Sequence, residues 1–143
     1  MSHDAASAAQ TAAAAERERI LVCDDDPRMR ETIVEVLAAE GLDVETADRA
    51  VDAIQRVMRT TYRALILDPK LPGLGGLDAI AVVKRFDESL PIIVMTGHAS
   101  YDVEQAARAA GIFYYLVKPF NLEELIAAVR AAIRFRDSSR RRV

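Results

Sequence analysis

The chain has 143 residues, a net charge of −3, 51% hydrophobic residues and 29% charged residues, a mixture typical of one soluble globular domain with a buried core. The negative charge argues against a general affinity for nucleic acid, and no apolar run approaches the roughly 18–20 residues of a membrane span. One cysteine and two histidines exclude an internal disulfide and disfavour a zinc site, and this cysteine usage suits a reducing cytoplasm, where we expect the protein.

Both ends of the chain differ in composition from its middle. Residues 1–18 are rich in alanine and lack a face of large apolar side chains, so we expect a disordered or fraying helical extension. No lysine or arginine precedes its alanines, which argues against a signal peptide. Residues 137–143 are expected to form a basic, solvated tail, which leaves residues 19–136 as the folded domain.

Five short runs in the middle of the chain predict β-strands. Four of them are continuously apolar, as in buried strands, whereas the second alternates and predicts a half-exposed strand. The runs are residues 20–23, 42–47, 64–67, 91–95 and 113–117.

Amphipathic helices are predicted after each of these runs. Side chains suited to helix N-caps precede four of them, namely Asp26, Asp48, Ser100 and Asn121. Gly41 and Gly111 are expected to close the first and the fourth helix. Strands that alternate with helices predict an α/β fold, in which a doubly wound, five-stranded parallel sheet carries its five helices on both faces.

Polar side chains stand at the carboxyl ends of the predicted strands. They are Asp24 and Asp25 after the first, Asp68 after the third, Thr96 at the fourth and Lys118 at the fifth. In a parallel sheet these ends lie on one rim, where such sheets bind ligands. Each residue alone is also typical of a cap, a turn or a solvated strand end, so the signal is their convergence.

The residue types on this rim indicate phosphoryl chemistry. Three carboxylates close together repel one another, and a divalent cation relieves that repulsion. Oxygen ligands without His or Cys favour Mg²⁺. Lys118 is a compact cation suited to phosphate, and the Thr96 hydroxyl and the Gly97 amide add donors. These are the parts that phosphoryl transfer to an aspartate requires.

The motifs together resemble the receiver domains of two-component response regulators, which have a CheY-like fold. The resemblance runs from Ile20 to about Arg136. It rests on residues 20–27, on Leu67-Asp68 with Leu71-Pro72-Gly73 and Gly76 downstream, on residues 95–98 and on residues 115–120. The Thr-Gly-His and Lys-Pro-Phe sequences are most similar to NtrC- and FixJ-type receivers.

The resemblance implies a flavodoxin-like strand order of 2-1-3-4-5 and a phosphoacceptor role for Asp68. A sensor histidine kinase or a phosphotransfer protein would donate the phosphoryl group, and Lys118 would pair with a phosphoryl or carboxylate oxygen. Mg²⁺ would be bound by Asp25, Asp68 and the backbone carbonyl of Lys70, with Asp24 acting through water. The backbone amides of Lys70 and Gly97 would contact the phosphoryl group as well.

The same resemblance assigns a conformational switch. Thr96 would hydrogen-bond the phosphoryl group and move toward it, and the aromatic ring of Tyr115 would change rotamer in response. The output surface would be the fourth helix, the fifth strand and the fifth helix. The alternative interpretation of Tyr115 is a half-buried core aromatic. The resemblance thus implies a phosphoacceptor that assists its own phosphorylation and dephosphorylation and is not otherwise an enzyme.

A few positions depart from the usual receiver pattern. Pro69 directly follows the acceptor and stiffens the loop, Gly75 stands where an acidic residue is common, and Tyr114 is large for its position. Lys70 and His98 each lie two residues past a site residue, so we hypothesise that they set the hydrolysis rate of the acyl phosphate.

Two other functions remain open on the sequence alone. A haloacid-dehalogenase-type phosphatase would use Asp24 and Asp26 but would leave Asp68 idle, and a pseudo-receiver would bind partners without being phosphorylated. A dinucleotide-binding domain is disfavoured because no Gly-x-Gly-x-x-Gly follows the first strand. The expected partners are the phosphodonor, an output protein or a lost output domain, and a possible second copy of the chain. We expect no direct contact with nucleic acid and none with a membrane.

Overall fold

The computed structural model of the protein describes residues 18–70 and 76–141. The extension expected over residues 1–18 lies outside the described residues, except for Glu18. The Leu71-Pro72-Gly73 motif and Gly75 lie outside them as well.

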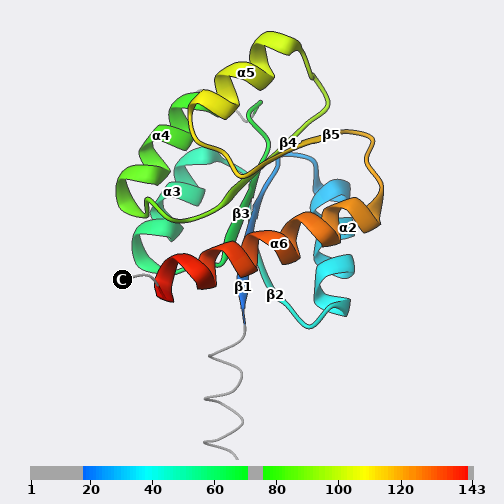
Figure 1. Ribbon diagram of the computed structural model, residues 1–143. Helices are drawn as coiled ribbons and strands as arrows, with labels where there is room; N and C mark the ends of the chain where they lie inside the picture. Colours follow the sequence, from blue (N-terminus) through cyan, green and yellow to red (C-terminus); the bar gives the residue numbers. More distant parts are fainter. Residues whose placement is uncertain (1–17, 71–75, 142–143) are drawn as a thin grey trace, which may run out of the picture.

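The strands form one parallel sheet in the order β2-β1-β3-β4-β5 (Figure 1), which confirms the expected α/β fold and strand order. The strands are β1 (Arg19–Cys23), β2 (Asp43–Ala47), β3 (Ala64–Leu67), β4 (Ile92–Thr96) and β5 (Tyr114–Val117). Every residue of β3 and β4 is buried, whereas the first four residues of β2 are half-buried. This difference follows from position, because β3 and β4 lie inside the sheet and β2 is an edge strand.

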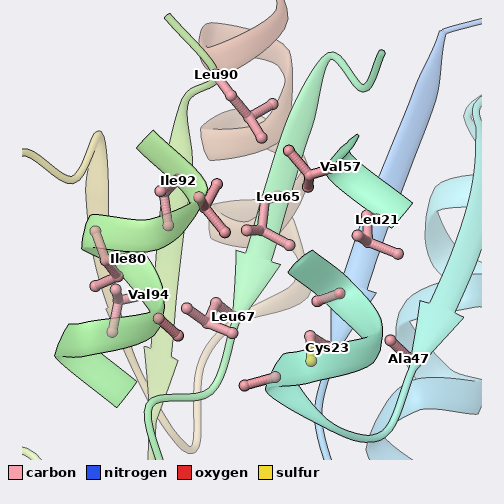
Figure 2. Close-up of a cluster of buried hydrophobic side chains, with 14 of the residues drawn as sticks. Leu21, Cys23, Ala47, Val57, Leu65, Leu67, Ile80, Leu90, Ile92 and Val94 are labelled. Atoms are coloured by element: carbon pink, nitrogen blue, oxygen red, sulfur yellow. The ribbon is translucent and has the colours of Figure 1, made fainter. Parts of the chain in front are cut away.

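Helices cover both faces of the sheet (Figure 1). They are α2 (Pro27–Ala39), α3 (Ala50–Arg59), α4 (Gly76–Phe86), α5 (Tyr101–Ala109) and α6 (Leu122–Arg141). Side chains of α3, α4 and α5 pack on one face, in a cluster that includes Leu65 and Leu67 of β3 and Ile80 of α4 (Figure 2). Side chains of α2 and α6 pack on the other. The two apolar clusters hold the strand ends in fixed relative positions.

Three of the expected helix caps are present. The side chain of Asp26 accepts a hydrogen bond from the Arg28 amide at 3.0 Å, and that of Ser100 accepts one from the Val103 amide at 3.1 Å. The side chain of Asn121 accepts one from the Glu123 amide at 2.7 Å. Gly41 and Gly111 follow their helices with φ angles of 83° and 91°, which a side chain would disfavour.

The prediction that Asp48 caps the second predicted helix was wrong. Helix α3 begins at Ala50, and Arg49 occupies the N-cap position without a side-chain hydrogen bond to the helix. Asp48 lies one residue too early for its carboxylate to serve as the cap. The negative charge at this helix end comes instead from Asp52 in the first turn.

The last helix passes the domain boundary expected after residue 136. Helix α6 continues to Arg141, and its C-terminal half packs against the amino ends of the strands. Arg136 is only 3% exposed and donates to both carboxylate oxygens of Asp87, at 2.7 and 2.5 Å. Asp137 pairs with Arg63, and the rings of Phe113 and Phe135 lie 5.3 Å apart. Local composition missed these contacts because their partners are distant in sequence.

We predict that Arg136→Ala destabilises the fold by about 2 kcal/mol, because it leaves the partly buried Asp87 carboxylate without its partner. Arg134→Ala, an exposed position on the same helix, should change the free energy of unfolding by less than about 0.5 kcal/mol. Urea denaturation of both variants checks this. Equal stabilities for the two variants would contradict the role assigned to Arg136.

Candidate functional site

Three carboxylates meet at the carboxyl ends of β1 and β3. These strands are neighbours in register, with Cys23 opposite Leu67, so the residues that follow them lie side by side. One carboxylate oxygen from each of Asp24, Asp25 and Asp68 lies within 4.8 Å of the others. Asp24 is fully buried, Asp68 is 7% exposed and Asp25 is exposed. The structure therefore forms the acidic cluster that the sequence predicted.

Lys118 joins this cluster from the far side of β4. Its Nζ donates to Asp24 Oδ2 at 2.9 Å and to Asp68 Oδ2 at 3.0 Å. Burial disfavours the charged ammonium, but hydrogen bonds and charge from the two carboxylates outweigh that effect and raise the pKa of Lys118 above its usual value. The lysine is thus a fixed positive charge at neutral pH.

Backbone amides hold the buried carboxylates in place. Asp24 Oδ1 accepts from the Asp26 amide at 3.0 Å, and Asp68 Oδ1 accepts from the Lys70 amide at 2.9 Å. Among the described residues, the Asp25 carboxylate accepts no hydrogen bond. Both oxygens of Asp24 and both oxygens of Asp68 therefore accept hydrogen bonds, whereas Asp25 keeps its oxygens free for a ligand among the described residues. This oxygen-only donor set suits a hard divalent cation such as Mg²⁺.

Thr96 lies beside the cluster at the end of β4. It is buried, and its Oγ1 accepts a hydrogen bond from the His98 amide at 3.0 Å. A cavity of about 160 Å³ opens next to it, lined by Pro69, Lys70, Gly76, Leu77, Thr96, His98 and Val103. Lys70 and His98 therefore line the same cavity as Thr96.

Two glycines near the site differ in how tightly they are packed. A Cβ atom at Gly76 would clash with the backbone oxygen of Pro69, so no side chain fits there without movement of the backbone. A Cβ atom at Gly97 would be 3.8 Å from Lys118, which is an ordinary contact. The backbone at Pro69 therefore passes close to Gly76, which the sequence did not predict.

Tyr115 shares a sheet face with Thr96. It lies opposite Val94 in the register of β4 and β5, and side chains two residues apart on a strand share a face. Tyr115 is 9% exposed and packs in the apolar cluster of that face. Its buried hydroxyl has no hydrogen-bond partner among the described residues. Leaving such a group unpaired costs about 1–3 kcal/mol.

Arg30, which the sequence did not single out, also contacts this site. Arg30 of α2 donates from Nη1 to the backbone oxygen of Asp24 at 2.6 Å. The signal was present, because helical spacing places residue 30 one turn after the N-cap Asp26, above the end of β1.

No helix in the described part of the chain is both long enough and apolar enough to cross a membrane.

Comparison with known proteins identifies the family. The family model of the response regulator receiver domain matches residues 20–130. Response regulator MprA of Mycobacterium leprae (strain TN) is 40% identical over 116 residues, which cover 81% of this chain and 51% of that protein, so the chain spans about half the length of this relative.

Solved structures agree with this match. A response regulator receiver domain from Clostridium thermocellum is 29% identical with a TM-score of 0.77, covering 82% of this chain and 94% of its own. The beryllofluoride-activated NtrC4 receiver domain dimer is 27% identical with a TM-score of 0.79, covering 82% and 98%. With its 2-1-3-4-5 sheet and acidic rim, the chain belongs to the response regulator receiver domains of two-component signalling systems.

Proposed function

We propose that this receiver accepts a phosphoryl group on Asp68 from a phosphohistidine of a sensor kinase or phosphotransfer protein. The observation that carries the proposal is the Lys118 ammonium, which binds Asp24 and Asp68 at once. This contact places a cation beside the nucleophile, where the charge of an incoming phosphoryl group needs it.

The transfer is an in-line displacement at phosphorus. A carboxylate oxygen of Asp68 forms the new P–O bond as the P–N bond of the phosphohistidine breaks, and the electron pair leaves with the imidazole nitrogen. Lys118 offsets negative charge on the phosphoryl oxygens, and the hydroxyl of Thr96 and the amides of Lys70 and Gly97 supply hydrogen-bond donors. The Thr96 hydroxyl is suited to this task because its oxygen accepts a hydrogen bond from the His98 amide while its proton is donated to no group among the described residues.

The chain's residues also suggest how Mg²⁺ is held. Asp25, Asp68 and the backbone carbonyl of Lys70 would bind the ion directly, and Asp24 would act through water. In support, Asp24 is fully buried with both carboxylate oxygens hydrogen-bonded, whereas Asp25 is exposed and free among the described residues. When bound, Mg²⁺ supplies charge neutralisation to the phosphoryl oxygens and relieves repulsion among the carboxylates.

Phosphorylation would be communicated through Thr96 and Tyr115. Thr96 would donate its hydroxyl proton to the phosphoryl group and move toward it, and this movement would weaken the hydrogen bond that its oxygen accepts from the His98 amide. Tyr115 lies on the same sheet face. Because its buried hydroxyl has no hydrogen-bond partner among the described residues, the observed rotamer of Tyr115 is less favoured over its other rotamers than it would be with that hydroxyl paired. The output surface would then be α5, β5 and α6, where Tyr101, Val117 and Leu122 are exposed.

The alternative functions fit the geometry less well. A phosphatase with its nucleophile on β1 would need Asp24 and Asp26, but Asp24 is hydrogen-bonded at both oxygens and Asp26 caps α2. A pseudo-receiver would not need the complete set of rim groups. We further propose a cytoplasmic location, a separate or attached output module and a possible homodimer, with no direct contact to nucleic acid or membrane.

We predict that acetyl phosphate and Mg²⁺ add one phosphoryl group to the wild-type chain and none to Asp68→Asn, because the amide is not a nucleophile. Intact-mass spectrometry measures the addition, and chelation of Mg²⁺ should abolish it. Asp78→Asn, an exposed carboxylate on α4, is the matched control and should label normally. Labelling of Asp68→Asn, or multiple turnover of a phosphomonoester by the wild type, would contradict the proposal.

The residues that flank the site should set the lifetime of the acyl phosphate. Lys70→Ala and His98→Ala are each expected to change its half-life severalfold, because both residues line the cavity next to Thr96 and each lies two residues past a site residue. Decay of phosphate from labelled protein measures the half-life, with exposed Arg85→Ala as control. Unchanged half-lives in both variants would refute this role.

Thr96→Ala should separate phosphorylation from the switch. The variant retains Asp68 and Lys118 and should still be labelled, but the ring resonances of Tyr115 should no longer shift on phosphorylation. Nuclear magnetic resonance of the aromatic protons tests this, with Tyr114→Phe used to separate the two neighbouring tyrosines. A full Tyr115 shift in Thr96→Ala would show that Thr96 does not transmit the signal.

A further inference from the structure

Arg30 makes an unusual contact for an arginine beside an acidic cluster. Its Nη1 donates to the backbone oxygen of Asp24 at 2.6 Å, and this oxygen is the only hydrogen-bond partner of the Arg30 side chain among the described residues. Asp24 belongs to the acidic cluster with Asp25 and Asp68, yet the guanidinium forms an ion pair with none of these three carboxylates in the described structure. The side chain therefore holds the backbone and not a carboxylate.

The carbonyl that Arg30 holds belongs to the peptide unit between Asp24 and Asp25. A peptide unit is planar, so a hydrogen bond to its oxygen also restricts the orientation of the next residue. The carboxylates of Asp24 and Asp68 are each fixed by an amide and by Lys118. For Asp25, whose carboxylate has no such contact among the described residues, Arg30 provides a restraint through the backbone.

We propose that Arg30 is a positioning residue that orients Asp25 for Mg²⁺ by anchoring the Asp24–Asp25 peptide unit. The inference rests on the proposed function, because it assumes that Asp25 is a magnesium ligand. Groups that orient metal ligands commonly change metal affinity by about 10- to 100-fold when they are removed.

Because Arg30 is positively charged, the direction of the change in Mg²⁺ affinity on its removal tests this role. A positive charge near a cation site weakens cation binding, so removal of that charge should by electrostatics alone strengthen binding of Mg²⁺. A positioning role predicts the opposite, because loss of the hydrogen bond frees the Asp24–Asp25 peptide unit. Arg28 is the matched control, since it is an exposed arginine on the same turn of α2.

The experiment measures Mg²⁺ affinity by calorimetry on the full chain without a phosphodonor. We expect Arg30→Gln to bind about tenfold more weakly than wild type. The Mg²⁺ affinity of Arg30→Lys should lie between those of wild type and Arg30→Gln, since lysine keeps the positive charge and a hydrogen-bond donor on a shorter side chain. Arg28→Gln should bind equally or more tightly. In metal-free protein, the amide order parameter of Asp25 should fall in Arg30→Gln and stay unchanged in Arg28→Gln.

Binding by Arg30→Gln that equals or exceeds that of wild type would overturn the inference. Thermal unfolding shows whether this variant is folded; if it is not, Arg30→Lys carries the test, and affinity equal to wild type overturns the inference. Failure of the proposed function can be distinguished from failure of this inference by the wild-type measurement. Wild-type protein that does not bind Mg²⁺ would contradict the proposed metal site, and with it the role of Arg30, before any variant is compared.

Discussion

The ammonium of Lys118 between Asp24 and Asp68 is the interaction on which the site depends. It links the ends of β1, β3 and β5, and it neutralises one of the three carboxylate charges gathered there. Two of the three carboxylate charges remain uncompensated, and a divalent cation carries the positive charge that balances them. The same ammonium lies beside the proposed phosphoacceptor, so one residue supports both the resting cluster and the reaction proposed for it.

The two ends of the domain are built differently. At the amino ends of the strands, the buried Arg136–Asp87 pair and the Asp137–Arg63 pair lock α6 to the base of the sheet. At the carboxyl ends, among the described residues, the Thr96 hydroxyl accepts a single hydrogen bond and the Tyr115 hydroxyl has no partner. A rigid base and an adjustable rim suit a signalling domain, because small changes at the rim can shift a population without unfolding the frame.

The sequence alone determined the fold class, most helix ends and the rim residues. Apolar runs and helical spacing reflect which side chains must be buried, and caps such as Asp26 and Ser100 act within three residues of their own position. Predictions from local sequence were wrong where contacts with other parts of the fold decide where a helix begins or ends. Asp48 looked like a cap but lies one residue before the N-cap position, and the composition-based boundary after 136 falls inside α6.

Only the tertiary structure decided which partners the site residues contact. Lys118 and Asp24 are separated by 94 positions, and no local pattern specifies that their side chains meet. The close packing of Pro69 on Gly76 and the contact of Arg30 with the Asp24 carbonyl depend on backbone positions that the assembled sheet and helices define. The sequence specifies which groups reach the rim because burial is encoded locally, whereas their pairing requires the distances that packing creates.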